Sequence, residues 1–115
     1  MLIFNNLTYL PLNSKYRSET IGLDRLASAV GASEVYPEQN ILIIDAGTAV
    51  TYDFISRDNE FLGGNISPGL KLRYKALHEY TKKLPLFEPQ KIDLFFGQTT
   101  EEAIIAGVQN GILFE

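Results

Sequence analysis

The sequence contains no cysteine and a single histidine, His78. Without cysteine the chain has no disulfide, no thiolate nucleophile and no cysteine-ligated metal cluster, and one histidine is too few for a histidine-based metal site. The sequence also lacks an apolar run near the ~20 residues that a transmembrane helix needs. Its first ten residues, MLIFNNLTYL, have neither a basic segment nor a small-residue cleavage site, so no signal peptide is expected. We therefore expect a cytoplasmic protein.

An excess of positive charge is absent as well, because the formal net charge is −4. This acidic balance disfavours non-specific binding to nucleic acid or to an anionic membrane, so we expect neither as a partner. The composition is 45% hydrophobic and 21% charged over 115 residues. Such a chain can bury a core, so it is expected to be a folded domain, or part of one, rather than a disordered segment.

The first predicted helix lies in the segment ETIGLDRLASAVGA. Apolar side chains recur there at helical spacing and would share one face: Leu23, Leu26, Ala27 and Val30. We expect the helix to run over residues 21–31, with Thr20 or Ser18 as its N-cap and Gly31 as its end.

Three strands in an antiparallel meander are expected next. The segments ILIID and AVTYDFI favour strands and are joined by a turn at 46–48. The apolar run before Asp45 predicts that the first of these strands is buried. A turn at 56–60 then leads to FLGGNI, a third strand that we expect Gly63 and Gly64 to interrupt.

A longer helix is predicted after the meander. Ser67 is its predicted N-cap, Pro68 occupies its first position, and Pro85 ends it. Lys82 and Lys83 are expected in its last turn, where they would complement the helix dipole.

The other charged residues of that helix have a structural interpretation. We expect Lys71, Arg73 and Lys75 on its solvated face and His78 as a partly exposed structural residue. With a final helix after residue 98, these elements predict an α/β fold.

The stretch DAGT, 45–48, allows two interpretations. A glycine-containing turn between strands can direct backbone N–H groups and the Thr48 hydroxyl at a phosphate, while Asp45 holds a neutralising cation. An Asx-type turn, in which Asp45 bonds to its own backbone, explains the same residues. Thr51 and Asp53, which follow closely, favour a site.

Two other short segments also have a structural and a functional interpretation. In GLDR, 22–25, the Asp and Arg either complement a first helical turn and pair with each other, or form a base beside a cationic anchor. In GGNISPG, 63–69, the glycines permit either a β-bulge before a helix or a close backbone approach to an anion.

The segment FGQTTEE leads into the last predicted helix. Thr99 and Glu102 have the T-x-x-E spacing of a capping box, which assigns the cap to Thr99. Thr100 is then surplus to capping and is a candidate for a hydrogen bond to a ligand. The sequence stops within this helical pattern, so we expect no C-cap.

In their order and spacing these segments resemble the type III pantothenate kinase family. The family pattern runs G-x-D-R, D-x-G-T-x-x-T-x-D, F-x-G-G-x-I-x-P-G, L-P, and G-x-x-T before a G-x-x-x-G helix, and the resemblance covers residues 10–115. It implies phosphorylation of pantothenate by ATP to 4′-phosphopantothenate, the first step of coenzyme A biosynthesis. It also implies Mg²⁺ with the nucleotide, a monovalent cation (K⁺ or NH₄⁺) and a homodimer.

The resemblance implies the fold of the actin, hexokinase and Hsp70 ATPases, in which two ribonuclease-H-like lobes flank the active site. Residues 1–39 would then close the first lobe, and residues 40–115 would open the second. The family's first phosphate motif, D-x-G-N, does not occur in this sequence. We therefore expect the central portion of a longer kinase, inactive by itself.

The resemblance also assigns roles by motif position. Asp24 matches the catalytic base that acts on the primary hydroxyl of pantothenate. The positions that match pantothenate contacts are Tyr16, Gly22, Leu23, Arg25 and Thr100. The positions that match the cation ligand and the nucleotide-phosphate contacts are Asp45, for the cation, and Gly47 and Thr48, for the phosphates.

Three other functions are compatible with parts of the pattern. Members of the family have also been described as Bvg accessory factors, a role in transcription for which the acidic charge disfavours direct DNA contact. A sugar kinase or phosphatase of the actin-like group is disfavoured by G-x-D-R and G-x-x-T. A non-catalytic dimerisation module would use Gly107 and Gly111, which lie four residues apart on one helix face.

Overall fold

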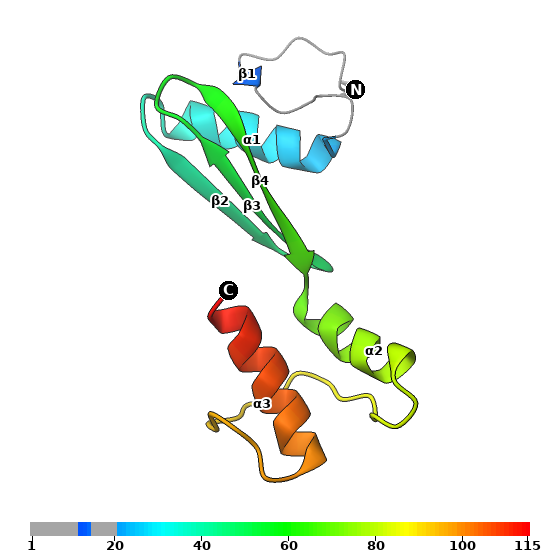
Figure 1. Ribbon diagram of the computed structural model, residues 1–115. Coiled ribbons are helices and arrows are strands. Elements are labelled where there is room, and N and C mark those ends of the chain that lie inside the picture. The colour runs from blue at the N-terminus through cyan, green and yellow to red at the C-terminus, as the bar shows by residue number, and fades with distance from the viewer. Residues whose placement is uncertain (1–11, 15–20) are drawn as a thin grey trace. The chain divides into compact units, whose positions relative to one another are not determined.

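The computed structural model describes residues 12–14 and 21–115. The elements follow one another as β1 (Asn13–Ser14), α1 (Leu23–Val35), β2 (Ile41–Ala46), β3 (Ala49–Ile55), β4 (Glu60–Pro68), α2 (Leu70–Tyr80) and α3 (Thr100–Leu113) (Figure 1). The strands form one sheet in the order β1-β4-β3-β2, in which β2, β3 and β4 are antiparallel and β1 pairs in parallel with β4. The predicted α/β meander followed by helices is confirmed. None of the described helices is long and apolar enough to cross a membrane.

The chain divides into two compact units, each described here by itself. The sheet unit comprises the described residues up to Asp45 together with Thr51–Ile66. The helical unit comprises Ala46–Val50, which contains the turn between β2 and β3, together with Ser67–Glu115. The assignment of residues 1–39 and 40–115 to two lobes stays a prediction.

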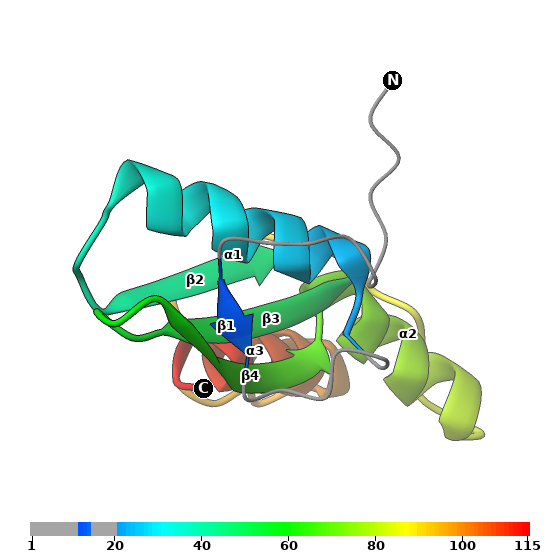
Figure 2. The ribbon, with the colours of Figure 1, turned by 90° about the horizontal axis from the view of Figure 1, so that it is seen from above.

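In the sheet unit, α1 lies along one face of the sheet (Figure 2). Apolar side chains at helical spacing on α1 meet inward-facing side chains of the strands. The buried cluster consists of Ile21, Leu26, Ala29, Ile55 and Phe61, with Leu12, Ala32, Ile41 and Ile43 packed against it. Burial of these apolar groups is the main favourable term for the unit, because each removes hydrocarbon surface from water.

The predicted limits of α1 were wrong at both ends. The N-cap position is Gly22, in extended conformation and without a side-chain cap, and the predicted caps Thr20 and Ser18 lie outside the described residues. The helix also continues through Gly31 to Val35. A glycine ends a helix when its backbone turns left-handed, whereas Gly31 keeps the helical conformation.

Replacing Gly31 with alanine is expected to raise the free energy of unfolding by about 0.5–1 kcal/mol, because alanine loses less backbone entropy on folding. Gly31 is exposed, and a Cβ there would meet no atom within 4 Å. Urea denaturation followed by circular dichroism measures the change, and a loss of stability would contradict it.

Strand β2 is half exposed, contrary to the predicted burial. Ile41 and Ile43 pack against the core under α1, whereas Leu42 and Ile44 are 49% and 58% exposed. Successive side chains of a strand point to opposite faces of the sheet, so an apolar run is not buried along its whole length when α1 covers one face.

Strand β4 is longer than predicted and shortens the helix that follows. It runs without interruption through Gly63 and Gly64 to Pro68, and Gly69 is the N-cap of α2. The predicted N-cap Ser67 is therefore wrong. Pro68, predicted as the first helical position, still belongs to the strand, and the helix begins two residues later at Leu70.

In the helical unit, α2 and α3 pack against each other. Their buried cluster consists of Tyr74, Ile104, Ile105 and Val108, with Leu70, Leu77, Leu84, Phe87 and Ile92 packed against it. Helix α2 ends at Tyr80, before Lys82 and Lys83, because the Thr81 hydroxyl donates to Leu77 O at 2.5 Å and accepts from Leu84 N at 3.3 Å.

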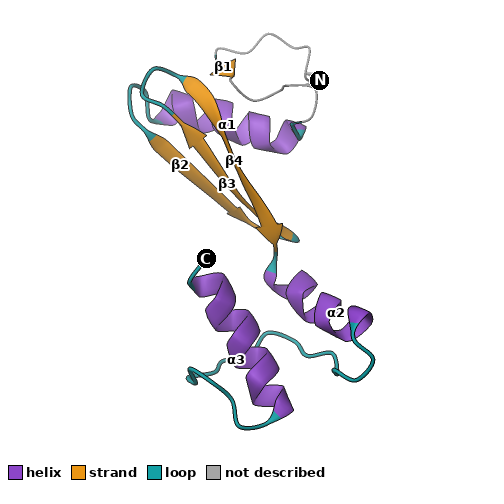
Figure 3. Ribbon diagram, in the orientation of Figure 1, coloured by secondary structure: helices purple, strands orange, loops and turns teal. Residues whose placement is uncertain are grey.

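The segment between the two helices, residues 81–99, contains no strand (Figure 3). It is held to α3 by Gln109, whose side chain accepts from Gln90 N at 3.0 Å and donates to Gln90 O at 2.8 Å. Helix α3 ends at Leu113, with Phe114 as a C-cap that donates to Asn110 O, so the expectation of no C-cap was wrong.

Candidate functional site

Asp24 lies in the first turn of α1, and its side chain is exposed. A carboxylate is favoured at this position because the helix N-terminus carries partial positive charge. Gly22, directly before the helix, leaves room for it, since a Cβ on Gly22 would lie 2.6 Å from Asp24 Oδ1. The carboxylate is thus held at a helix start and remains accessible to a ligand.

Arg25, the next residue, is buried and paired. Its Nε donates to both carboxylate oxygens of Asp53 at 3.1 Å, and its Nη2 also donates to Asp53 Oδ1. Arg25 is 7% exposed and Asp53 1%. The pair joins the start of α1 to β3, so it connects the GLDR and DAGTAVTYD segments. The interpretation in which the Asp and Arg of GLDR pair with each other is not needed, because Asp53 is the carboxylate partner of Arg25.

The turn between β2 and β3 is closed by its own backbone and by the start of α2. Gly47 N donates to Ala49 O at 2.9 Å, and Gly69 N donates to Thr48 O at 2.8 Å. Thr48 itself is exposed. A Cβ on Gly69 would overlap the carbonyl oxygens of Gly47 and Thr48, so glycine is required for this close approach.

Replacing Gly69 with alanine is expected to lower the free energy of unfolding by about 1–3 kcal/mol, because backbone must move to admit the methyl group. Urea denaturation measures the loss. The matched control is Gly31→Ala, the same chemical change at a site with open space, where the sign should be opposite. Equal effects of the two substitutions would show that the approach of Gly69 to the turn is not tight.

A pocket beside this turn is formed within the helical unit. We call it the hairpin pocket; its lining residues are Gly47, Thr48, Leu70, Lys71, Leu72, Lys75 and Pro89, and its volume is about 490 Å³. Leu70 and Lys71 begin α2, whose first N–H groups have no acceptor within the helix. Lys71 and Lys75 are exposed, as predicted, although Lys75 also lies 3.7 Å from Glu79. Ammonium groups beside a helix N-terminus favour an anion such as phosphate.

Arg73 does not lie on the solvated face that the sequence predicted. Its Nε donates to Pro68 O at 2.8 Å, its Nη2 donates to Ser67 Oγ at 2.9 Å, and it pairs with Glu115. Hydrogen bonds from Ser67 and then Arg73 lower the pKa of Glu115. Arg73 is therefore a structural residue at the start of α2. His78 is exposed and has a structural contact as predicted, between Nδ1 and Leu84 O at 2.8 Å.

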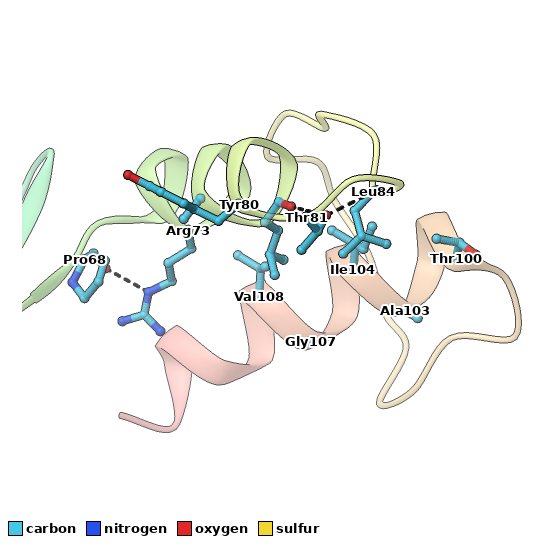
Figure 4. A pocket seen from close by; sticks show the side chains of 12 residues that line it. Pro68, Arg73, Tyr80, Thr81, Leu84, Thr100, Ala103, Ile104, Gly107 and Val108 are labelled. Carbon is cyan, nitrogen blue, oxygen red and sulfur yellow. Dashed lines mark hydrogen bonds between the residues drawn. The ribbon is translucent and has the colours of Figure 1, made fainter.

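Thr99 caps α3, as the sequence predicted, and the ligand contact of Thr100 stays a prediction. The Thr99 hydroxyl accepts from Glu102 N at 3.1 Å and caps α3, while Glu102 Oε2 accepts from Gln98 N at 2.9 Å. Thr100 is exposed and lines a groove between α2 and α3 (Figure 4). The groove has a volume of about 770 Å³ and is otherwise lined mainly by apolar side chains, with Arg73 and Thr81 among the polar ones.

Thr99→Ala is expected to lower the free energy of unfolding by about 1 kcal/mol, because it removes the cap of α3. Thr100→Ala, the adjacent control, should change it by less than about 0.5 kcal/mol, since an exposed side chain with no role in the cap is removed. Urea denaturation of both variants tests the assignment. A larger loss for Thr100→Ala would reverse it.

The predicted site residues are distributed over both units. The sheet unit contains Gly22, Leu23, Asp24, Arg25 and Asp45, and the helical unit contains Gly47, Thr48 and Thr100. Tyr16 lies outside the described residues. The structure brings Gly47 and Thr48 together in the hairpin pocket, whereas Thr100 lines a different cavity. The partner that Asp53 provides for Arg25 was missed, although the proximity of Asp53 to the DAGT turn had marked it.

All 115 residues match the family model described as Type III pantothenate kinase. A relative of that name from Porphyromonas gingivalis is 50% identical over 117 residues, which cover 99% of this chain and 48% of the relative. Another, from Flavobacterium johnsoniae, is 46% identical over 113 residues, covering 97% of this chain and 46% of the relative.

A solved structure is similar in fold and sequence. It is a Campylobacter jejuni protein described as a Baf family transcriptional activator, with a TM-score of 0.64 and 31% identity, covering 92% of this chain and 48% of that one. The chain thus spans about half the length of the relatives it matches. It belongs to the type III pantothenate kinase family.

Proposed function

We propose that the kinase containing this chain transfers the γ-phosphoryl group of ATP to the primary hydroxyl of pantothenate, forming 4′-phosphopantothenate in coenzyme A biosynthesis. The observation that carries the proposal is the match of the whole chain, at up to 50% identity, to proteins named Type III pantothenate kinase. Because the chain spans about half the length of these relatives, the activity is proposed for the whole kinase.

Asp24 is proposed as the catalytic base. An alcohol is far more basic than an ionised carboxylate, so Asp24 does not deprotonate pantothenate in a separate step. It orients the hydroxyl and accepts its proton as the new oxygen–phosphorus bond forms and the bond from phosphorus to the ADP oxygen breaks. Its exposed position at the start of α1 supports this role, because a substrate oxygen can reach the carboxylate.

The hairpin pocket is proposed to receive nucleotide phosphates. Thr48 would supply its hydroxyl as a donor, Gly47 would let a phosphate approach the turn closely because it has no side chain, and Lys71 would add positive charge. In the described parts of the chain, no three His, Cys, Asp or Glu side chains gather closely enough to hold a metal ion. The exposed carboxylate of Asp45 fits as a single oxygen ligand of a K⁺ or NH₄⁺ ion, whose other contacts would be phosphate, water or backbone oxygens. Bound cations, including the Mg²⁺ of the nucleotide, would neutralise phosphate charge.

The pantothenate contacts are proposed from the family's motif positions. The candidates are Tyr16, Gly22, Leu23, Arg25 and Thr100. Leu23 is 40% exposed, which makes it available to an apolar part of the substrate.

The groove that contains Thr100 has an apolar lining suited to a second copy of the protein, and the homodimer is proposed on that basis.

The fold of the lobes and the cellular location of the protein are also proposals. We propose that the sheet and helices are parts of ribonuclease-H-like lobes, as in actin-like ATPases, and that the protein acts in the cytoplasm. The antiparallel meander followed by helices supports the first proposal.

The test is a coupled assay of the whole kinase with ATP, Mg²⁺, K⁺ and pantothenate, in which product formation is confirmed by mass spectrometry. We expect 4′-phosphopantothenate, with turnover that falls when Na⁺ replaces K⁺. ATP hydrolysis without phosphorylated pantothenate would overturn the proposal. Activity that is equal in Na⁺ would overturn the cation role of Asp45 alone.

Transcriptional regulation is a second candidate, because the similar Campylobacter jejuni structure is described as a transcriptional activator. The net charge of −4 does not support direct DNA binding. A whole protein that binds promoter DNA but leaves pantothenate unmodified would favour this function over the kinase.

A further inference from the structure

Asp53 is a buried carboxylate on β3 with a fixed partner. It is 1% exposed, and both of its oxygens accept hydrogen bonds from Arg25, which is 7% exposed. β4 also shapes its surroundings, because a Cβ on Gly64 would overlap Tyr52 O and Asp53 Oδ1. Three elements, α1, β3 and β4, therefore fix where this carboxylate lies.

A buried ion pair is a poor device for stability alone. Removing two charges from water offsets much of their attraction, and an apolar pair of similar volume is often as stable or more so. What such a pair does supply is geometry. The planar guanidinium of arginine accepts one orientation when a carboxylate binds its Nε and an Nη atom, because its donors form a rigid fork.

We infer that Asp53 is a positioning residue, which orients the guanidinium of Arg25 for pantothenate binding beside Asp24. The inference rests on the proposed function, because Arg25 is a pantothenate contact only there. Arg25 directly follows Asp24 in the first turn of α1, so anchoring one side chain also restrains the backbone that carries the other. The substrate's own charge or hydrogen bonds then meet a pre-oriented cation rather than a flexible one.

Steady-state kinetics of the whole kinase test the inference with Asp53→Asn, which keeps the size of the side chain and removes its charge. We expect KM for pantothenate to rise about tenfold or more and KM for ATP to change by less than about twofold. The control is Asp58→Asn, at an exposed carboxylate in the turn before β4, which should leave both constants unchanged. A residue that only supports folding would reduce the active fraction, and thus apparent kcat, with both KM values intact.

Two further variants keep the test decisive. If Asp53→Asn does not fold, Asp53→Glu retains the buried charge but moves the carboxylate by one methylene, and the same rise in KM for pantothenate is expected. In Arg25→Ala, adding Asp53→Asn should raise KM for pantothenate no further, because Asp53 acts through Arg25. Additive increases, or an unchanged KM in the single variants, would overturn the inference.

A spectroscopic measurement separates this inference from the kinase proposal. In ¹⁵N-labelled chain, the Nε–H signal of Arg25, assigned from Arg25→Lys, should exchange slowly with water and lose that protection in Asp53→Asn. Rapid exchange in the unmodified chain would overturn the positioning role. Failure of the unmodified whole kinase to phosphorylate pantothenate would overturn the proposed function. It would also remove the role of Asp53 in orienting Arg25 for pantothenate, whatever the exchange rate.

Discussion

Replacing Asp24 with asparagine is expected to lower the turnover of the whole kinase by about 10²-fold or more. Asparagine has the size of aspartate but cannot accept the proton of the attacking hydroxyl, so the loss should appear mainly in kcat. The fold should be unaffected, because Asp24 is exposed in the first turn of α1 and packs into no core. The free energy of unfolding should change by less than about 0.5 kcal/mol.

The measurement is the coupled kinase assay, with circular dichroism and urea denaturation of the same protein. Glu34→Gln is the matched control, since Glu34 is an exposed carboxylate on the same helix and its loss should leave turnover unchanged. Near-normal turnover in Asp24→Asn would remove Asp24 from the role of base. A large loss in both variants would point to helix charge rather than to proton transfer.

Local pattern was sufficient for the elements that surround the candidate site. Runs of strand-favouring residues located β2 and β3, the flanking prolines located α2, and the T-x-x-E spacing located the start of α3 and separated the capping Thr99 from Thr100. Two helix limits were predicted wrongly from cap residues, namely the end of α1 at Gly31 and the start of α2 at Ser67. Pro68 belongs to β4 rather than to the helix, so α2 begins later than predicted, and Gly31 keeps the helical conformation, so α1 continues past it.

The contacts that complete the site were beyond local pattern. Arg25 and Asp53 are 28 positions apart, and their pairing depends on how α1 packs on β3. Arg73 was predicted to be solvated because its neighbours Lys71 and Lys75 are. Its guanidinium instead donates hydrogen bonds to Pro68 O and Ser67 Oγ, before the start of α2. Spacing along the chain locates residues on elements, whereas such partners are set by tertiary packing.

The buried pair also predicts an unusual pattern of stability. Asp53→Val is expected to lower the free energy of unfolding by about 3–5 kcal/mol, because it removes the buried carboxylate that pairs with the buried guanidinium of Arg25. Arg25→Met should cost a similar amount for the opposite reason. The double variant should be more stable than either single one, since both charges are gone and valine suits a strand position.

Urea denaturation of the chain measures these free energies, and kinetics of the whole kinase measure their functional counterpart. Stability should return in the double variant while KM for pantothenate stays high, because an apolar pair restores packing but offers the substrate no cation. Exposed Arg57→Met and Asp58→Val, on the turn before β4, are matched controls for the loss of charge alone. Additive losses of stability would show that Arg25 and Asp53 contribute to stability independently, and would contradict the prediction. Recovery of KM together with stability would mean that Arg25 and Asp53 support the fold and nothing more.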